Sequence, residues 1–440
     1  MAVNMETSRP VPAAMQRMVS QPTGRRRVVV IGGGLIGTAT AYAAARIGGD
    51  GVRVSLYEAA TLGHEGGASI DVTRVFRHAY GESAHYTRWA QEALKLWHDL
   101  EEGTGRSLFC RTGAAWIAST DEQRAASTGL ERLVSPGAAL HMLQASFQTM
   151  RAVGLPCELV DGAEVRRRYP QFASDTIAAA LVDPGAGMLF ARDAVLALRE
   201  ACLRYGVELH EGQPITEVQP QRGGCAVRAA NGTSVEADVV VLAINGWTGR
   251  LLPDLAARLP VPEGARGYTF GPGLQNTEQP LFYFALPAGV AEELAPGRFP
   301  VFLFANADVY GLPAHLGAVK VANDGAARLL DQPEQRRLAG DAYRQQLHEF
   351  LVRQLPVLRS AALLQERVCF YDRSPDGHFV LDQWDGDARL IVACGFSGHG
   401  FKFGPVTGAR LARYALSGQR PPDLVPFSLM RFHRRPDAAA

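Results

Sequence analysis

The sequence predicts an α/β protein, with a parallel sheet covered by helices on both faces and a second domain on a mixed, largely antiparallel sheet. Three observations predict this class. A strand, glycine turn, helix and strand follow one another at 27–58, and strands and helices alternate again at 192–244 and 389–416. Residues 281–325 are instead rich in aromatic and β-branched residues broken by Gly and Pro. Alternating elements are typical of parallel sheets, and the last pattern is typical of antiparallel ones.

The first unit has the pattern of a dinucleotide-binding site. A buried strand at 27–31 runs into GGGLIG (32–37), a helix follows to about Ile47, and a second strand at 52–57 ends at Glu58. The first glycine makes the turn, the second lets the backbone approach a pyrophosphate, and the third lets helix and strand pack closely. An acid about 20 residues further on is placed to accept a hydrogen bond from a ribose hydroxyl. The motif does not distinguish FAD from NAD.

The same stretch imitates a signal peptide, because Arg25–Arg27 precede an apolar run with small residues. The glycine spacing favours the strand and turn. Residues 1–23 are polar and aperiodic, which predicts a disordered extension.

The remaining elements follow from local patterns. We expect a helix at 192–205, strands at 206–209, 215–218, 224–229 and 239–244, a hairpin turn at Asn231-Gly232, a helix at 333–354, and a strand at 389–394. This last strand runs into a glycine-rich turn (395–404) and a helix to about Leu416. A helix start of this kind presents N–H groups to an anion or an electron-rich carbonyl; the alternative is a turn without a ligand.

Composition excludes several function classes. The 440 residues carry 45 basic and 44 acidic side chains, a net charge of +1, which argues against a nucleic-acid partner. No run of about 20 apolar residues exists, so no membrane span is expected. The six cysteines are scattered without CxxC pairs or metal-ligand spacing, which predicts reduced thiols, a cytoplasmic protein and no metal.

Lysine is scarce among the basic residues. Only Lys95, Lys320 and Lys402 stand beside 42 arginines. Genomic drift toward arginine codons explains such a ratio. A surviving lysine also marks positions where a compact ammonium of shiftable pKa cannot be replaced by a wide, always-charged guanidinium. Lys95 lies on a predicted helix and has no expected role.

Four segments in order carry a resemblance to one family. They resemble the monomeric sarcosine oxidase and N-methyltryptophan oxidase group of the D-amino-acid-oxidase-like flavoproteins, and they are GGGLIGTATAY (32–42), DVTRVFRHAYGE (71–82), VCFYDRSPDGHFVLD (368–382) and CGFSGHGFKF (394–403). The resemblance is colinear from 27 to about 430. It implies a doubly wound, Rossmann-like FAD domain and a mixed-sheet substrate domain, the first from 24–107, 186–255 and 373–440 and the second from 108–185 and 256–372.

The resemblance implies a covalent flavin. Cys369 matches the cysteine bonded to the 8α-methyl of FAD, although most buried cysteines are structural. Thr73 and Arg74 match a loop that meets the flavin ring. The expected cofactor-binding residues are Gly32, Gly34, Ile36, Gly37, Glu58, Thr73, Arg74, Val218, Cys369, Gly395, Gly398, Gly400, Phe401 and Lys402.

The resemblance also implies catalytic roles. Arg77 and Lys402 match a pair that clamps a substrate carboxylate, and Arg74 lies beside them in the same segment as Arg77. Lys320 matches a lysine near flavin N5 that activates oxygen. Tyr310 and Tyr371 match residues that line the substrate pocket. The alternatives are surface charge for the arginines, a solvent-exposed strand end for Lys320 and half-buried sheet positions for the tyrosines.

One position departs from the family pattern. Four residues after Lys320, where sarcosine oxidases carry histidine, the sequence has Asp324. This carboxylate holds a cationic amine, or it is a turn residue in Asn-Asp-Gly. The departure puts sarcosine itself in doubt and favours a larger or cyclic secondary amine acid of the pipecolate or piperideine-carboxylate type.

The expected function is a monomeric, FAD-dependent amine oxidase. It would oxidise the C–N bond of an N-methyl or cyclic amino acid to an imine, with O2 reduced to H2O2. One alternative is a dehydrogenase that uses another electron acceptor, and a second is a non-catalytic assembly factor with a flavoprotein fold. The sequence does not name the amine, its stereochemistry or the fate of the imine.

Overall fold

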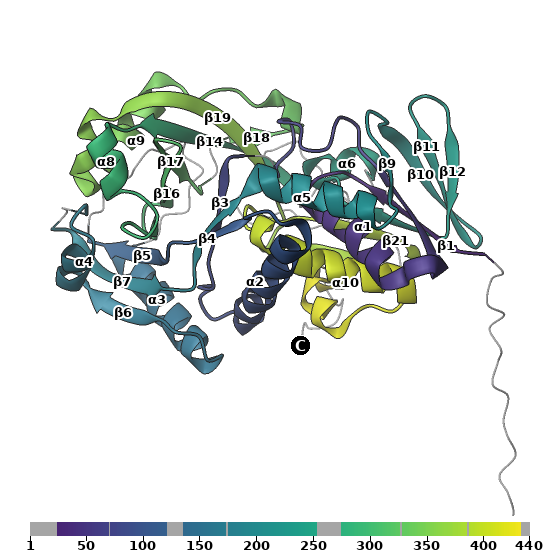
Figure 1. Cartoon of the computed structure of the whole chain (residues 1–440), viewed down its shortest axis with the longest axis horizontal. Helices are drawn as coiled ribbons and strands as arrows, with labels where there is room; N and C mark the ends of the chain where they lie inside the picture. The colour runs from purple at the N-terminus through teal and green to yellow at the C-terminus, as the bar shows by residue number, and fades with distance from the viewer. Residues whose placement is uncertain are drawn as a thin grey trace, which may run out of the picture.

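The computed structural model describes residues 24–69, 71–120, 135–172, 175–252, 274–325, 328–384 and 387–432. The predicted extension at 1–23 lies outside these ranges. Two sheets dominate the molecule: a six-stranded sheet on the right of Figure 1 and a nine-stranded sheet on the left. The predicted combination of a doubly wound domain with a mixed-sheet domain is confirmed.

The six-stranded sheet carries the predicted dinucleotide-binding unit. Its order is β20-β21-β13-β1-β2-β9, and every neighbouring pair is parallel except β20 and β21. The strands are β1 (Arg26–Ile31), β2 (Val52–Tyr57), β9 (Glu208–His210), β13 (Val239–Leu242), β20 (Val380–Trp384) and β21 (Asp387–Cys394). Both faces of the sheet are covered, which explains why β1 and β13 read as continuous apolar runs.

Alternate residues of β1 face two different cores. Val28 and Val30 pack with four helices, and Val29 and Ile31 pack toward a small antiparallel sheet on the other face. The helices are α1 (Leu35–Gly48), α2 (Ala84–Thr104), α5 (Ala191–Arg204) and α10 (Gly404–Ser417), and the small sheet is β10 (Ile215–Gln221), β11 (Gly224–Ala229) and β12 (Ser234–Ala237). The expected Asn231-Gly232 turn joins β11 to β12.

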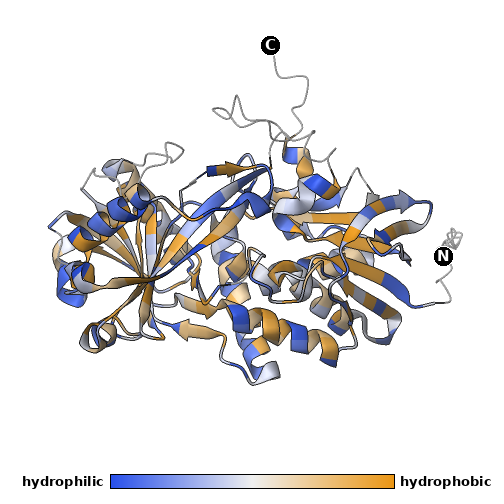
Figure 2. Ribbon diagram, turned by 90° about the horizontal axis from the view of Figure 1, so that it is seen from above, coloured by the Kyte–Doolittle hydropathy of each residue, from blue (hydrophilic) through white to orange (hydrophobic). Residues whose placement is uncertain are grey.

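The nine-stranded sheet is almost entirely antiparallel. Its order is β18-β14-β17-β16-β15-β5-β7-β6, with β19 paired to the other side of β14, and only β15 and β5 run parallel. The strands are β5 (Ala114–Ser119), β6 (Glu158–Asp161), β7 (Ile177–Asp183), β14 (Gln275–Ala285), β15 (Val301–Phe304), β16 (Val309–His315), β17 (Ala318–Asn323), β18 (Arg328–Leu330) and β19 (Ala362–Arg373). Figure 2 shows the apolar character of these strands beneath more polar helices.

The two faces of this sheet have different neighbours. On the outer face, Phe282 and Phe284 of β14 pack with helix α9 (Asp341–Gln354). On the inner face, Leu281 and Tyr283 of the same strand pack against Ala68 and Val72, from the segment that leads away from the six-stranded sheet. A cavity lies at this inner face.

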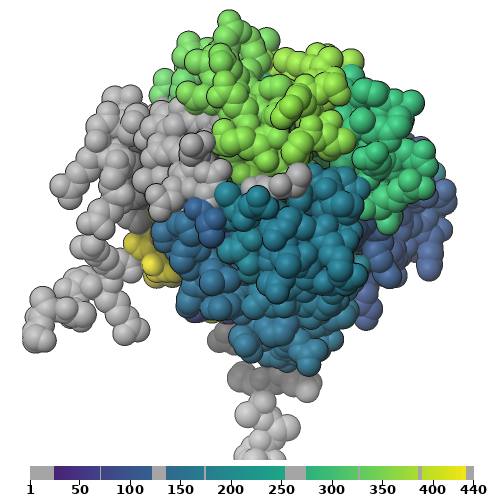
Figure 3. Space-filling view, turned by 90° about the vertical axis from the view of Figure 1, so that its left-hand side faces the viewer, coloured from purple at the N-terminus to yellow at the C-terminus, as the bar shows by residue number. Residues whose placement is uncertain are grey.

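The other elements cover the sheets or connect them. A small sheet, β3 (Thr73–Phe76), β8 (Gly187–Phe190) and β4 (Phe109–Arg111), bridges the two parts. The remaining helices are α3 (Pro136–Ala152), α4 (Gly162–Arg168), α6 (Thr248–Leu251) and α8 (Ala288–Glu293), with 3-10 turns at 49–51, 245–247, 333–335, 356–360, 401–403, 422–427 and 429–432. In Figure 3, residues near 135–190 form the lower part of one face and residues near 280–370 the upper part. No helix within the described ranges is long and apolar enough to span a bilayer.

The helix predicted at 333–354 is shorter than expected. It begins at Asp341, because 333–335 form a separate 3-10 turn capped by Gln332 and Gln335, and Gly340 precedes the helix in an extended conformation. The Gln and Arg residues of 333–340 resemble the polar surface of a helix. However, Pro333 begins only a short 3-10 turn, and the α-helix begins after Gly340.

Candidate active site

Two adjoining cavities lie where the two large sheets meet. The larger, of about 660 Å³, opens over the carboxyl ends of β1, β2 and β13, and the smaller, of about 130 Å³, lies against the inner face of the nine-stranded sheet. Both are lined by Leu35, Ile36, Ala68, Ser69, Asn245 and Phe396. In open α/β sheets, ligands bind at the carboxyl ends of the strands where the strand order reverses, which here is the gap between β1 and β13.

The glycine turn has no room for side chains. A Cβ atom on Gly33 would lie 2.9 Å from the Cβ of Glu58, and one on Gly37 would overlap the carbonyl oxygen of Gly32. Gly32, Gly33 and Gly34 line the larger cavity, whereas Gly37 packs α1 against the turn. The backbone therefore faces the cavity directly, as the motif predicts.

Glu58 is buried at the end of β2 and lines the larger cavity. Its Oε2 accepts from the Gly33 N–H at 2.7 Å, its Oε1 accepts from the Ala60 N–H at 2.9 Å, and His64 Nε2 lies 3.5 Å away. Val218 lies deeper, in the core under β10, and lines neither cavity. Residues 213–216, which precede Val218 in the chain, line the larger cavity instead.

The lining has the properties that a flavin dinucleotide requires. The side-chain oxygens of Asn245 and Gln279 are buried without a protein hydrogen-bond partner, and both residues line the smaller cavity. Unpartnered buried polar atoms are costly, so groups of a ligand are needed to satisfy them. The larger cavity has the glycine turn for a pyrophosphate, and the smaller continues from it. The residues present therefore fit FAD.

Strand register gathers distant residues on the inner face of the nine-stranded sheet. On β14, Gln279 lies opposite Cys369, and Tyr283 lies opposite Lys320. Side chains point to alternate faces along a strand. Gln279 and Tyr283 are both odd-numbered residues of β14, so Cys369 and Lys320, which lie opposite them, are on the same face of the sheet. Cys369 lines the smaller cavity together with Tyr310, Tyr371 and Asp324, whereas Lys320 does not line it.

Cys369 lies where attachment to a bound ring system is possible. Its side chain is buried, with Sγ 3.8 Å from Arg74 Nη2 and 3.7 Å from the carbonyl oxygen of Ala68. The other five cysteines all lie in described ranges, and none of them lines either cavity.

A buried carboxylate, Asp71, joins the predicted catalytic cations. Lys320 Nζ and Arg74 Nη1 both donate to Asp71 Oδ2, and Lys320 also donates to the carbonyl oxygen of Thr73 at 2.8 Å. Burial lowers the pKa of Lys320 to about 8, although Asp71 opposes this shift. Burial also acts to raise the pKa of Asp71, but the charges of Lys320 and Arg74 outweigh it and hold this pKa well below its usual range.

Sequence reasoning gave no role to Asp71. It opens the DVTRVFRHAYGE segment, and that position was its only signal.

The two residues of the predicted carboxylate clamp line the smaller cavity together. The Arg77 guanidinium lies over the rings of Tyr80 and Trp116, 4.3 and 4.4 Å from their centroids, and donates to the carbonyl oxygen of Ala79. Lys402 Nζ donates to Tyr80 Oη at 2.9 Å and to the carbonyl oxygen of His399 at 3.1 Å. Burial and the charge of Arg77 hold the pKa of Lys402 well below its usual range.

Trp116 was not predicted as a site residue. It lies in the buried strand AAWIAS (114–119), which reads as ordinary core. The third lysine, Lys95, lies exposed on α2.

Asp324 lies in a turn and also lines the smaller cavity. It follows β17, and in the turn Asn323 Oδ1 accepts from the Gly325 N–H at 2.7 Å. Its Oδ1 accepts from Tyr371 Oη at 3.2 Å. Burial raises the pKa of Tyr371 and of Tyr310 well above the usual range, so both phenols stay protonated.

The glycine-rich turn after β21 is held from behind by Asp372. The Asp372 carboxylate accepts from the N–H groups of Gly395, at 2.6 Å, and Phe396, at 3.1 Å. Burial raises the pKa of Asp372 to about 7, although these hydrogen bonds oppose the shift. Gly398, Gly400 and Phe401 line the smaller cavity, whereas Gly395 lies behind them.

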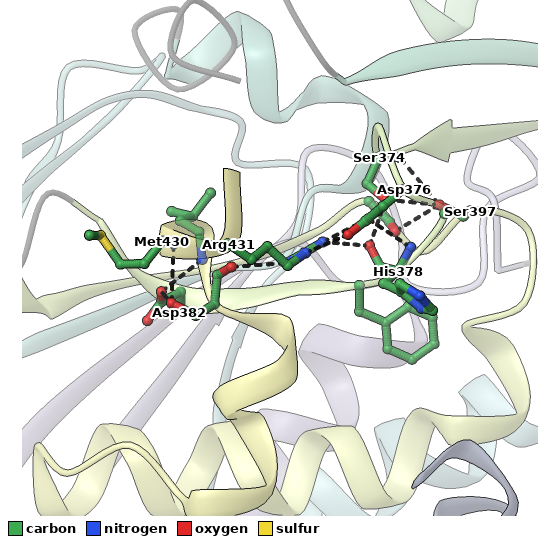
Figure 4. Close-up of polar contacts among 12 residues, drawn as sticks. Ser374, Asp376, His378, Asp382, Ser397, Met430 and Arg431 are labelled. Atoms are coloured by element: carbon green, nitrogen blue, oxygen red, sulfur yellow. Dashed lines mark hydrogen bonds and ion pairs between the residues drawn. The ribbon is translucent and has the colours of Figure 1, made fainter. Parts of the chain in front are cut away.

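The end of the chain supports the same turn (Figure 4). The Ser374 N–H donates to Ser397 Oγ at 3.2 Å, and Ser374 Oγ donates to Asp376 Oδ1 at 3.2 Å. Arg431 Nε donates to the other oxygen of Asp376 at 2.7 Å. Nearby, Asp382 accepts from the hydroxyl of Ser428 at 2.6 Å. These contacts fix the C-terminal segment to the loop before β20.

The described residues include no cluster of His, Cys, Asp and Glu that could hold a metal ion.

Comparison with known proteins agrees with this geometry. The family described as FAD dependent oxidoreductase matches residues 27–414. Monomeric sarcosine oxidase from Bacillus sp. (strain NS-129) is 28% identical over 410 residues, which are 92% of this chain and 96% of that protein. N-methyl-L-tryptophan oxidase from Yersinia pestis (strain Pestoides F) is 29% identical over 412 residues, which are 92% of this chain and 99% of that protein.

Solved structures share the fold. NikD, an amino acid oxidase of nikkomycin biosynthesis, aligns with a TM-score of 0.72 at 22% identity, covering 93% of this chain and 100% of that one. L-proline dehydrogenase from P. horikoshii aligns with a TM-score of 0.75 at 19% identity, covering 93% and 98%. At these identities the likeness concerns the architecture alone.

Proposed function

Because this chain belongs to the family of FAD-dependent oxidoreductases, we propose that it is an amine oxidase acting on a secondary-amine amino acid. It oxidises the C–N bond of an N-methyl or cyclic amino acid to an imine and reduces O2 to H2O2. The names of its relatives, sarcosine oxidase and N-methyl-L-tryptophan oxidase, support this substrate class.

The observation that carries the proposal is the pair of cations on the smaller cavity. Among the contacts of described residues, neither Arg77 nor Lys402 has a carboxylate partner; their hydrogen bonds go to carbonyl and phenol oxygens. Lys402 is buried and Arg77 is partly buried, and cations removed from water without a paired counter-ion are unfavourable. A substrate carboxylate supplies that counter-ion, and its charge raises the pKa of Lys402 on binding.

The remaining residues orient the amine. With the carboxylate held by Arg77 and Lys402, Asp324 and Tyr371 lie at another part of the same lining, where Asp324 attracts a cationic amine. The amine must lose its proton before its carbon is oxidised, since an ammonium has no lone pair. A carboxylate at 324 suits a cyclic amine acid of the pipecolate type.

The cofactor is held by the glycine turn, Glu58, Asn245 and the turn at 395–400, with covalent attachment through Cys369. The bound flavin supplies the acceptor for the electron pair that leaves the substrate and returns it to O2. Lys320 provides the positive charge that favours oxygen reduction, acting from behind the cavity lining through the contacts at Asp71 and Thr73.

The first experiment is anaerobic mixing of the yellow protein with a panel of N-methyl and cyclic amino acids. We expect bleaching of the flavin by at least one of them and one H2O2 per turnover after air is admitted. A colourless protein, or a flavin that no amine reduces, contradicts the proposal. Bleaching without peroxide favours a dehydrogenase with another acceptor.

A second experiment tests the covalent bond. After acid precipitation the yellow colour stays with the wild-type protein and with Cys110→Ser, whose thiol lies away from both cavities, but is lost from Cys369→Ser. Colour that leaves the wild-type protein on precipitation contradicts the attachment.

A further inference from the structure

We propose that Asp71 is a positioning residue that holds Lys320 in place and keeps it positively charged for the reaction with oxygen. The inference rests on the proposed oxidase function, and it assigns a role to a residue outside the cavity lining. Asp71 comes from the segment before β3, whereas Lys320 comes from the middle of β17, so the contact connects the two halves of the site.

The geometry around Asp71 is that of a dedicated counter-ion. Its side chain is 2% exposed. Lys320 and Arg74 donate to Oδ2, while Tyr283 Oη and the N–H of Val72 donate to Oδ1, the latter at 2.8 Å. Both carboxylate oxygens are therefore occupied, and the acid cannot turn away from the lysine without losing hydrogen bonds on its other side.

The other groups around Lys320 cannot replace this acid. Arg74 lies on the same carboxylate oxygen and repels the ammonium. Arg367 of β19, 3.9 Å from Asp71 Oδ1, is a second cation nearby. Tyr283 of β14 is a protonated phenol, since burial raises its pKa above the usual range. Cys369 of β19 favours the ammonium only as a free thiolate, and its sulfur carries no charge when it is bonded to the flavin. Without Asp71, burial and two guanidinium groups would all favour a neutral lysine.

The same contacts explain why this position is lysine in an arginine-rich chain. The ammonium fits between Asp71 Oδ2 and the carbonyl oxygen of Thr73, 2.8 Å from the latter. A planar guanidinium needs a wider space and keeps its charge in any surroundings. The ammonium of Lys320 can therefore gain or lose its proton, and the Asp71 carboxylate influences the pKa at which it does so.

The chain offers an unusually direct test, because it contains only three lysines. Labelling lysine with 13C gives three side-chain signals, and Lys320→Met identifies the one from Lys320. In the wild-type holoenzyme we expect this signal to titrate near pH 8. In Asp71→Asn we expect its midpoint to fall by at least one pH unit. Tyr283→Phe, which removes a hydrogen bond but leaves the carboxylate, should move the midpoint less. An unchanged midpoint in Asp71→Asn overturns the proposal.

A kinetic experiment gives the functional consequence. Reoxidation of the reduced flavin by O2 should slow in the wild-type protein as the pH rises through about 8, since the charged lysine is the effective form. In Asp71→Asn the same loss should occur at lower pH. The rate at neutral pH then falls about tenfold for each pH unit by which the midpoint drops below neutrality, and it recovers on acidification. A uniformly slow rate at every pH would indicate a purely structural role and would contradict the proposal.

A double variant keeps the inference testable if Asp71→Asn folds poorly. Asp71→Asn with Lys320→Met removes both opposite charges and leaves Arg74 and Arg367 as the cations near the neutral amide at 71. Asparagine at 71 should not slow reoxidation beyond the effect of Lys320→Met alone; a further loss contradicts the inference. If no amine reduces the flavin, the proposed function fails, while the lysine titration still decides the role of Asp71.

Discussion

The guanidinium of Arg77 contacts two aromatic rings, those of Tyr80 and Trp116, and donates to the backbone carbonyl of Ala79. This arrangement leaves other N–H groups of the fork for a ligand and prevents the long side chain from moving to solvent. Cation–π contacts with Tyr80 and Trp116 thus provide orientation that a salt bridge would otherwise supply, without neutralising the charge. The clamp remains available for a substrate carboxylate.

Replacing Arg77 with Gln should therefore raise KM for an amino-acid substrate by about 10- to 100-fold, since a hydrogen bond to a charged group contributes about 1.5–3 kcal/mol. The change in kcat should be smaller. Steady-state kinetics of the purified holoenzyme checks this, with Arg298→Gln as the control, because Arg298 is exposed, lines neither cavity and forms an ion pair with Glu292 at 3.0 Å. An unchanged KM in Arg77→Gln would mean that the carboxylate binds elsewhere.

Asp372 makes stability depend on pH. Burial raises its pKa to about 7, so the folded protein binds this proton more tightly than the unfolded chain does. The resulting stabilisation is present below about pH 4 and is lost as the pH rises through 7. Asp372→Asn does not ionise, so its melting temperature relative to the wild type should rise between pH 4 and pH 8.

Asp376 is the matched control for this prediction. Burial acts to raise its pKa, but the hydrogen bond and charge of Arg431 outweigh this and lower it. Its stabilisation is therefore lost as the pH falls, and Asp376→Asn should show the opposite trend, confined to acidic pH. Parallel melting curves for the two variants would contradict the assignment.

Among the elements, the turn between β21 and α10 packs closely against a residue of the candidate site. Gly398 has a φ of +83°, and a Cβ there would lie 2.5 Å from the ring of Tyr371. The turn between β10 and β11 contains Gly223, with a φ of +95° and no atom within 4 Å of its Cβ position. A side chain at either glycine would strain the backbone, because both have a positive φ. Only at Gly398 would the side chain also collide with a residue of the candidate site, Tyr371.

Gly398→Ala and Gly223→Ala separate these two effects. Each should lower the free energy of unfolding by about 1 kcal/mol from the left-handed backbone. Only Gly398→Ala should also displace Tyr371 and raise KM severalfold, as steady-state assays and thermal melting together will measure. Equal kinetics for the two variants would mean that Tyr371 has no contact with the substrate.

At the scale of the whole molecule, the cavities lie between two sheets that have separate cores. The larger cavity belongs to the six-stranded sheet, the smaller to the nine-stranded sheet, and the shared lining connects them. A cofactor that extends through both contacts both halves of the protein. Its binding therefore contributes to the stability of the folded state by mass action.

Removal of the flavin should lower the melting temperature. Cys369→Ala allows FAD to be stripped without breaking a covalent bond, and the stripped protein should melt several degrees below the same variant with FAD at about 100 times its Kd, a concentration that contributes about 2.7 kcal/mol. Scanning calorimetry of the two forms checks this. Identical transitions would mean that FAD does not bind the folded protein in preference to the unfolded chain.

The sequence predicted those features that depend on near neighbours. The glycine turn, Glu58 and the alternating elements come from local patterns, and the predicted strands at 27–31 and 52–57 lie within a residue of those in the structure. Gln279 was missed because its role depends on register between β14 and β19. Asp71 and Trp116 were missed because their roles depend on contacts between the segment at 71–77 and distant strands of the nine-stranded sheet. The start of α9 was wrong because composition resembled helix where Pro333 and Gly340 decided otherwise.

The inner face of the nine-stranded sheet has a consequence for how such a chain can change in length. Lys320 and Cys369 come from different strands and reach one site because each lies opposite an odd-numbered residue of β14. Deleting one residue at the start of β14 would move the side chains after the deletion to the opposite face, which takes Tyr283 away from Lys320 and brings Phe282 and Phe284 to the cavity side. Insertions and deletions are therefore tolerable in the connecting loops and damaging in β14, β17 and β19. A protein engineer can change the lengths of the loops but not those of these strands.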